Sequence, residues 1–207
     1  MARRRLTKRR LLGLDRSGGP PPETLSGHPL NPWTIPNAIG FTRLALLPVF
    51  LIVALRTDDG HSVAAFVIYA VVSGTDYLDG MAARITGQYS RLGALLDPLT
   101  DRALVISGAI VAWKYELLPR WALAVLAGRE LLMLVLTRIA FKKGFELEVK
   151  MLGRWAVWPT MAALALALVT DGWFVNTVLY VGLALTLVVT LEYLADGYRF
   201  FRPSSST

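Results

Sequence analysis

Apolar residues are gathered into six long stretches that short polar segments separate. Each stretch approaches the roughly 20 residues that a helix needs to cross the apolar layer of a bilayer. A chain of 207 residues has room for one such helical bundle and little more. The pattern therefore predicts an all-α integral membrane protein with six transmembrane helices, over residues 37–55, 62–83, 93–113, 120–141, 151–170 and 173–198.

The composition narrows the chemistry that such a bundle can carry. Apolar residue types make up 54% of the chain, which excludes intrinsic disorder as a description of the whole protein. The chain has no cysteine, so disulfides, zinc–thiolate sites and a cysteine nucleophile are excluded. It has only two histidines, and neither has the local partners of a metal site or a Ser-His-Asp relay.

The positive charge lies almost entirely at the N-terminus. Residues 1–16 carry seven basic side chains and one acid, while the rest of the chain is nearly balanced. Residues 17–32 are rich in Gly, Pro and Ser, which predicts a flexible linker. We therefore expect a basic, Pro/Gly-rich tail over 1–32, a helical domain over 33–202 and a short polar tail over 203–207. The basic tail lacks interleaved aromatic residues, so we expect no nucleic-acid partner.

The connecting segments differ in charge in a way that predicts orientation. Residues 84–92 and 142–150 are basic, whereas the other connections are poorer in basic residues or carry acids. Basic segments stay on the cytoplasmic side of a membrane. Both termini and these two connections are therefore expected in the cytoplasm, with the protein in the cell membrane.

Four carboxylates interrupt the second and third apolar stretches, namely Asp76, Asp79, Asp97 and Asp101. A charged side chain at the bilayer centre costs up to about 3 kcal/mol on insertion scales, so these acids need compensation. The neighbouring Arg84 and Arg102 supply only two positive charges.

Helical spacing brings these acids together. At 100° per residue, one face of the second helix carries Asp76, Asp79, Gly80 and Ala83. Asp97 and Asp101 share a face of the next helix, which a short connection makes an antiparallel neighbour. Four convergent carboxylates form an all-oxygen site that suits Mg²⁺, Mn²⁺ or Ca²⁺ rather than zinc or copper. Two divalent ions would balance the four negative charges.

The small residues beside the acids suggest the ligand. Gly80 and Ala83 leave room for a flat or bulky group to approach the backbone. Arg84 follows at the membrane surface, where a guanidinium can pair with a phosphate. Together with metal ions, these features indicate a nucleotide diphosphate bound beside the bilayer.

Residues 76–101 resemble the signature of the CDP-alcohol phosphotransferase family, D-x-x-D-G-x-x-A-R-x(8)-G-x-x-x-D-x-x-x-D. All eight specified positions match, with the spacing intact. The resemblance implies metal-dependent transfer of a substituted phosphate from a CDP-linked donor to an alcohol, with release of CMP. It also implies two divalent cations, Mg²⁺ or Mn²⁺ with Ca²⁺ as a non-productive occupant, a homodimer and a polar active site facing the cytoplasm of a bacterial cell.

The resemblance also implies roles for individual residues. Asp76, Asp79 and Asp97 would bind metal, and Asp101 would complete the metal site and act as general base. The CDP moiety would contact a further set, Asp76, Gly80, Ala83, Arg84, Gly93 and Asn37. Since the site is expected to open at the cytoplasmic leaflet, the expected donor is CDP-diacylglycerol.

The start of the first predicted helix resembles particular members of this family. Residues 36–43 resemble the P-N-x-x-T-x-x-R pattern of phosphatidylglycerophosphate synthases and bacterial cardiolipin synthases, with Gly40 in place of the usual Thr or Ser. Asn37 and Arg43 are therefore expected near the phosphates. The alternative for Asn37 is an ordinary helix cap after Pro36.

The acceptor is the least determined part of the prediction. Glycerol 3-phosphate needs a basic pocket, for which the candidates are Arg43, Arg129, Arg138, Lys150 and Arg154. Arg129-Glu130 and Arg138 resemble the R-E…R pattern of phosphatidylglycerophosphate synthases. Residues 153–157 lack the second lysine of the usual G-K-x-K-T, which leaves phosphatidylglycerol, and hence cardiolipin synthesis, as the alternative.

The alternative from another class is a transporter. Intramembrane acids and six spans are compatible with a divalent-cation transporter. Against a transporter, the acids cluster towards one side of the membrane and no inverted repeat is visible. Glycerol 3-phosphate transfer is therefore the first prediction, with membrane lipids as the surroundings of the site.

Overall fold

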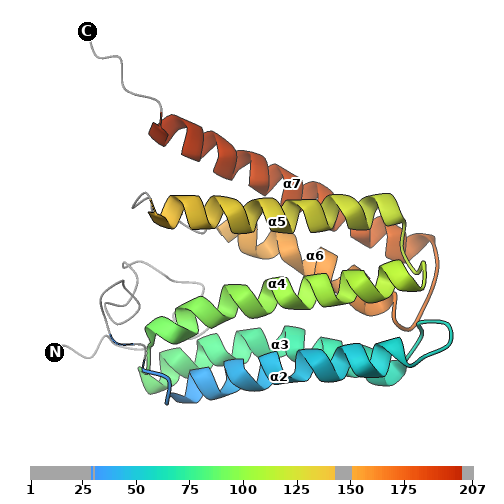
Figure 1. The fold of residues 1–207 in the computed structure, drawn as a ribbon, viewed down its shortest axis with the longest axis horizontal. Helices are drawn as coiled ribbons and strands as arrows, with labels where there is room; N and C mark the ends of the chain where they lie inside the picture. The colour runs from blue at the N-terminus through green and yellow to red at the C-terminus, as the bar shows by residue number, and fades with distance from the viewer. Residues whose placement is uncertain (1–28, 30, 143–150, 202–207) are drawn as a thin grey trace, which may run out of the picture. The chain divides into compact units, whose positions relative to one another are not determined.

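A computed structural model describes residue 29 and residues 31–142 and 151–201, with side chains over 29, 31–136 and 156–195. Within these ranges all regular secondary structure is helical, as Figure 1 shows. The helices are α2 (Ile35–Leu55), α3 (Val63–Thr86), α4 (Arg91–Lys114), α5 (Arg120–Lys142), α6 (Met151–Leu166) and α7 (Trp173–Phe201). Each helix overlaps one of the six predicted stretches, so the all-α prediction is confirmed.

Several helix boundaries differ from the prediction. α3 continues to Thr86 and α4 begins at Arg91, so Arg84 lies on a helix and the connection is only residues 87–90. Gly87, with a φ of 67°, ends α3 in a conformation that other residues rarely adopt. At the other end of the chain, α6 stops at Leu166 rather than near residue 170.

Two of the described helices are long and apolar enough to cross a membrane, α2 and the segment Trp173–Ala195 of α7. α3 and α4 carry the predicted acids, α5 carries internal charges, and α6 has only 16 residues. Crossing by all six helices therefore stays a prediction. Most of both predicted tails lies outside the described residues.

The described chain divides into two compact units. The first runs to Val53 and resumes at Val67–Leu104, so it holds most of α2 and α3 and the first half of α4. These helices run alongside one another in Figure 1. Their core includes Phe50 and Tyr69, whose rings meet edge to face with centroids 5.2 Å apart.

Matching caps begin two helices of the first unit. The Thr34 hydroxyl accepts a hydrogen bond from the Asn37 backbone N–H at 3.3 Å, and the Ser90 hydroxyl accepts one from the Gly93 N–H at 2.9 Å. A side-chain oxygen at the N-cap satisfies an N–H group that has no partner within the helix. These caps fix where α2 and α4 start.

The second unit comprises Ala54–Phe66 and the chain from Val105 onward. Within it α7 packs against α6 and α5. The crossing with α6 is close, because a Cβ added at Gly182 would lie 2.6 Å from the backbone nitrogen of Thr160.

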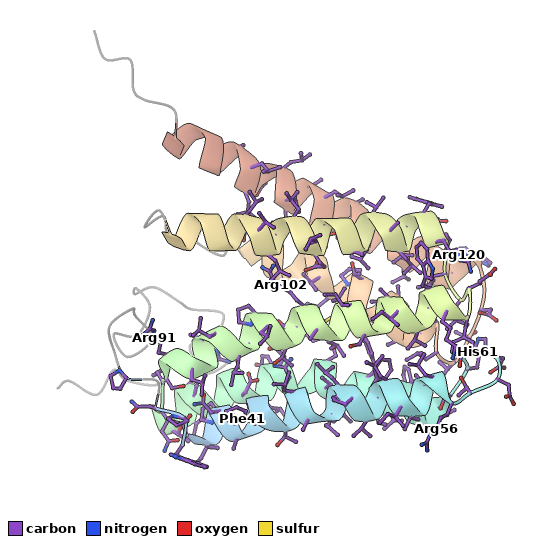
Figure 2. All side chains as sticks on the ribbon, viewed as in Figure 1. Phe41, Arg56, His61, Arg91, Arg102 and Arg120 are labelled. Atoms are coloured by element: carbon purple, nitrogen blue, oxygen red, sulfur yellow. The ribbon has the colours of Figure 1, made fainter. Side chains whose placement is uncertain are left out.

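Polar contacts join two connections of this second unit. The Ser62 N–H donates to the Leu168 carbonyl at 2.7 Å, and His61 Nε2 lies 3.2 Å from a carboxylate oxygen of Asp171. Figure 2 shows His61 at the same end of the unit as Arg56 and Arg120.

Candidate active site

A buried arginine lies at the centre of the candidate site. The side chain of Arg43, on α2, is 1% exposed. Its Nε donates a hydrogen bond to the Val72 carbonyl at 3.0 Å. Its Nη1 donates to Asp76 Oδ1 at 3.0 Å and to Asp79 Oδ2 at 3.1 Å, and its Nη2 donates to Asp101 Oδ1 at 2.9 Å.

Helix periodicity explains why these acids meet. Asp76 and Asp79 are three residues apart and project from the same face of α3, while Asp101 comes from α4. Asp97, one turn before Asp101, interacts electrostatically with the other three acids and with Arg43. The first unit thus brings together all four acids of the signature around one positive charge.

The acids differ in how far they reach solvent. The Asp79 side chain is 4% exposed, whereas those of Asp76 and Asp101 are 41% and 36% exposed. Four carboxylates outnumber the positive charges of Arg43, Arg84 and Arg102, which leaves an excess of negative charge at a partly open surface. Such a surface attracts cations.

The carboxylate oxygens of the four acids are ligands that suit a hard divalent cation, but in this structure they are arranged around Arg43. Among the described residues, no three acidic or histidine side chains surround a common point as metal ligands. The guanidinium of Arg43 instead lies among three of the carboxylates. Each of these carboxylates gives one oxygen to Arg43, so its other oxygen is not used by that hydrogen bond. All available ligand atoms are oxygens, as Mg²⁺ and Mn²⁺ prefer.

The predicted CDP-binding positions Gly80 and Arg84 lie beside these acids on α3. A Cβ added at Gly80 would find only the guanidinium of Arg84, no nearer than 3.7 Å. Ala83 is half-buried on the same helix. The structure therefore leaves open space over Gly80, with a positive charge at its edge.

Asn37 and Gly93 form a tight polar contact between α2 and α4. Asn37 Nδ2 donates to the carbonyls of Asn31 and Pro32, at 2.9 and 3.1 Å, and the Ser90 hydroxyl donates to Asn37 Oδ1 at 2.8 Å. We call Asn37, Ser90 and Gly93 the amide cradle. Thr34 is the cap of α2, so Asn37 is not the cap that the alternative expected. Its contact with CDP stays a prediction.

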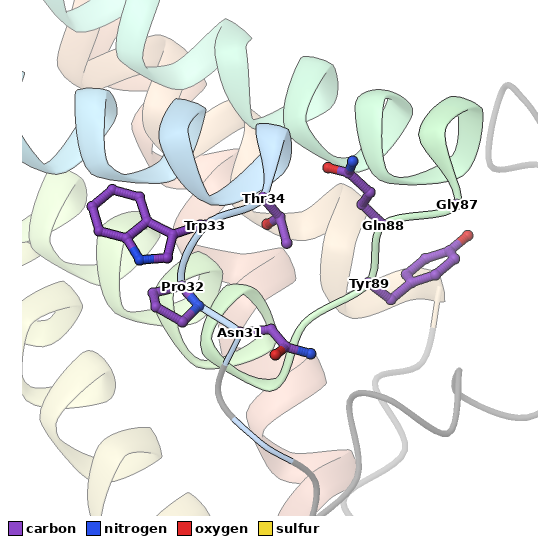
Figure 3. Close-up of a pocket in the computed structure, with 7 residues that line it drawn as sticks. All are labelled: Asn31, Pro32, Trp33, Thr34, Gly87, Gln88 and Tyr89. Atoms are coloured by element: carbon purple, nitrogen blue, oxygen red, sulfur yellow. The ribbon is translucent and has the colours of Figure 1, made fainter.

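An open pocket adjoins the amide cradle. It has a volume of about 340 Å³ and lies between the start of α2 and the α3–α4 connection, as Figure 3 shows. Gln88, one of the residues that line this pocket, accepts a hydrogen bond from the Ile35 backbone N–H at 3.0 Å. Its lining consists of Asn31, Pro32, Trp33, Thr34, Gly87, Gln88 and Tyr89.

Arg129 is the predicted acceptor residue, other than Arg43, whose side chain the structure describes, and it lies on α5 in the second unit. Arg129 Nε donates to the Thr190 hydroxyl at 3.1 Å, and its Nη1 pairs with Glu130. Glu130 and Thr190 are buried, so Arg129 is engaged within the helices. The side chains of Arg138 and Arg154, and all of Lys150, lie outside the described residues.

Two features of these sites are not predicted by the sequence pattern. The sequence points to Arg84 and Arg102 as the positive charges beside the acids and to Arg43 near phosphates, whereas Arg43 binds three of the acids directly. A single arginine within an apolar helix is a signal for a buried partner. Glu130 and Thr190 are also not predicted as partners of Arg129.

The sequence profile for CDP-alcohol phosphatidyltransferase matches residues 33–189. The chain belongs to the CDP-alcohol phosphatidyltransferase family. This confirms the predicted family and the predicted reaction class, phosphatidyl transfer from a CDP-linked donor to an alcohol. The alternative of a cation transporter has no support from this assignment.

Individual relatives fall into two groups within this phosphatidyltransferase family. The CMP-forming cardiolipin synthase of Streptomyces coelicolor is 39% identical over 144 residues, which are 67% of this chain and 66% of that protein. The CDP-diacylglycerol–glycerol-3-phosphate 3-phosphatidyltransferase of Bacillus subtilis is 27% identical over 192 residues, 84% of this chain and 100% of that protein. A putative cardiolipin synthase of Mycobacterium tuberculosis is 34% identical over 113 residues, 55% of this chain and 53% of that protein.

Proposed function

We propose that this protein transfers the phosphatidyl group of CDP-diacylglycerol to glycerol 3-phosphate, forming phosphatidylglycerophosphate and CMP. The observation that carries the proposal is the convergence of Asp76, Asp79 and Asp101 on the Arg43 guanidinium in the first unit, within an intact family signature. The Bacillus subtilis relative, which aligns over its whole length, is named for this reaction.

Two divalent cations, Mg²⁺ or Mn²⁺, complete the proposed site, with Ca²⁺ as a non-productive occupant. Their ligands would be the four acids Asp76, Asp79, Asp97 and Asp101. When bound, such ions neutralise the charge that the diphosphate oxygens carry during displacement at phosphorus.

The remaining side chains bind and orient the substrates in this proposal. Gly80 and Ala83 admit the CDP moiety to the face of α3, and Arg84 pairs with its phosphates. Asp101 takes the proton of the acceptor hydroxyl. The hydroxyl oxygen forms a bond to the phosphorus of the phosphatidyl group, and the bond from that phosphorus to the CMP oxygen breaks.

We further propose that all six helices span the cell membrane of a bacterium and that the protein is a homodimer. The basic segments support a cytoplasmic position for both termini, for residues 142–150 and for the active site. Residues 33–202 form the enzyme domain in this proposal, between the basic tail 1–32 and the short tail 203–207.

Phosphatidylglycerol is the second candidate acceptor, with cardiolipin as the product. Three observations favour it. The Streptomyces coelicolor relative with 39% identity is named a cardiolipin synthase, and the second lysine of the G-K-x-K-T pattern is missing here. Arg129, expected to bind an acceptor phosphate, is already paired with Glu130.

One assay separates these reactions. Purified protein with Mg²⁺ or Mn²⁺ and CDP-diacylglycerol is given glycerol 3-phosphate or phosphatidylglycerol, and CMP and the lipid product are measured. Phosphatidylglycerophosphate formed from glycerol 3-phosphate supports the first proposal, and cardiolipin formed from phosphatidylglycerol supports the second. CMP release no higher than that of an Asp101→Asn variant with either acceptor would refute both.

A further inference from the structure

We propose that Arg43 is a positioning residue that holds the acids of the site close together and so supports the binding of divalent cations. It does so by binding one oxygen of each of Asp76, Asp79 and Asp101 and leaving the other oxygen to a cation. The inference rests on the proposed function in one respect, since it takes these acids to be the metal ligands of the transferase.

A backbone hydrogen bond orients the Arg43 guanidinium independently of the carboxylates. Its Nε donates to the carbonyl of Val72, one helical turn before Asp76 on α3. A planar guanidinium held at Nε has its Nη atoms in set directions. Nη1 then reaches both acids of α3, and Nη2 reaches Asp101 on α4. Arg43 thereby joins three helices at one point.

The positive charge of Arg43 offsets the repulsion between the carboxylates. Carboxylates close to one another repel, and two of the three are also open to solvent, which would let them turn apart. A positive charge that is 1% exposed opposes that movement, since solvent screens it little. Arg43 therefore keeps the acids together whether or not a divalent cation is bound.

The hydrogen bonds leave the acids able to bind metal. Arg43 uses Oδ1 of Asp76, Oδ2 of Asp79 and Oδ1 of Asp101, which leaves one oxygen on each. Asp97 interacts with Arg43 electrostatically and is not one of its hydrogen-bond partners in the described structure. Carboxylate ligands of metals are commonly hydrogen-bonded in this way through their second oxygen, and losing such a partner weakens metal affinity about 10–100-fold.

Binding of Mn²⁺ to the purified protein without substrate tests the proposal. We expect Arg43→Met to weaken Mn²⁺ binding about 10-fold or more, as measured by calorimetric titration in detergent. Arg43→Lys should bind with intermediate affinity, because it keeps the charge but loses the planar fork. Arg56→Met is the control, since Arg56 is an exposed arginine outside the site (Figure 2) and should bind Mn²⁺ as the wild type does.

The opposite result has a clear meaning. If Arg43 competes with the cation for the same oxygens, Arg43→Met will bind Mn²⁺ more tightly than the wild type. Tighter or unchanged binding in Arg43→Met would therefore overturn the proposal.

Arg43→Met can also fail to fold, because it leaves the buried Asp79 without its partner. In that case Asp79→Asn is added, which removes the most buried of the carboxylate charges. Recovery of a folded protein in the double variant, judged by thermal unfolding in EDTA, supports the charge-holding role of Arg43. Failure to recover would refute it.

These measurements need no CDP-diacylglycerol, so they are independent of the transferase assay. Weaker Mn²⁺ binding in Arg43→Met with no CMP release by the wild type would contradict the proposed reaction alone. CMP release by the wild type with unchanged Mn²⁺ binding in Arg43→Met would contradict the positioning role alone.

Discussion

Replacing Gly93 by alanine should destabilise the protein, although alanine is the better helix former. The added Cβ would lie 2.7 Å from Asn37 Oδ1 and 3.1 Å from the Ser90 hydroxyl. Asn37 cannot easily move away, because it is 1% exposed and its Nδ2 is bound to the carbonyls of Asn31 and Pro32. The methyl group therefore has to displace one side of the amide cradle.

The size of the effect follows from three contributions. Forcing a methyl group into a packed site costs about 1–3 kcal/mol. Breaking the hydrogen bond from Ser90 to Asn37 costs about 1 kcal/mol more. Alanine returns at most about 1 kcal/mol through helix propensity. We expect a net loss of about 1–3 kcal/mol, which lowers the melting temperature by about 2–4 °C per kcal/mol in a domain of this size.

Thermal unfolding in detergent measures this loss, and CMP release shows whether the site is disturbed as well. Gly74→Ala is the matched control, since nothing lies within 4 Å of a Cβ added there on α3. The control should be neutral or slightly stabilising. If Gly93→Ala melts at or above the wild-type temperature, the amide cradle is not tightly packed and this reasoning is wrong.

Three further predictions concern stability. Gly182→Ala should lower the melting temperature, because its Cβ would lie 2.6 Å from the Thr160 backbone nitrogen, which cannot rotate away; unchanged melting would mean that α6 and α7 are not in close contact. Tyr69→Phe should be neutral or stabilising, because the buried hydroxyl has no hydrogen-bond partner among the described residues; a loss above about 1 kcal/mol on thermal unfolding would contradict this. The pKa of Asp59 is lowered chiefly because the backbone N–H of His61 donates a hydrogen bond to its carboxylate at 2.9 Å. The stability that this contact gives the protein is therefore complete above the usual Asp pKa and is lost as pH falls through the lowered pKa. Asp59→Asn should therefore melt below the wild type at pH 7 and together with it in acid, and an equal gap at both pH values would exclude the linkage.

Apolar length predicted which segments are helical but not where every helix ends. The charge of Arg84 predicts the start of a connection, yet a long basic side chain can extend to water from a residue that stays on the helix. Conversely, Ala167 and Leu168 are apolar and buried but lie in a turn after α6. Hydrophobicity indicates burial, and the caps that end helices are a separate signal.

In the candidate site, too, the sequence predicts contacts within one helix but not contacts between residues far apart in the chain. The shared face of Asp76 and Asp79 follows from helix periodicity alone. The partnership of Arg43 with Asp101 does not, because 58 residues separate them and the pairing depends on how whole helices are rotated against one another. The amide cradle was equally hidden, since Ser90 meets Asn37 across 53 residues.

The buried arginine also constrains how the chain is made. In the proposed topology, Arg43 enters the membrane on α2, before its partners Asp76, Asp79 and Asp101, which follow 33, 36 and 58 residues later. At about 5–20 residues per second, synthesis takes several seconds to supply them. During that time an unpaired guanidinium costs up to about 3 kcal/mol at mid-membrane, which the strongly apolar remainder of α2 has to offset. The first helix is therefore more than an anchor: exchanging it for another hydrophobic segment would ease insertion and leave the acids of α3 and α4 without their counter-charge.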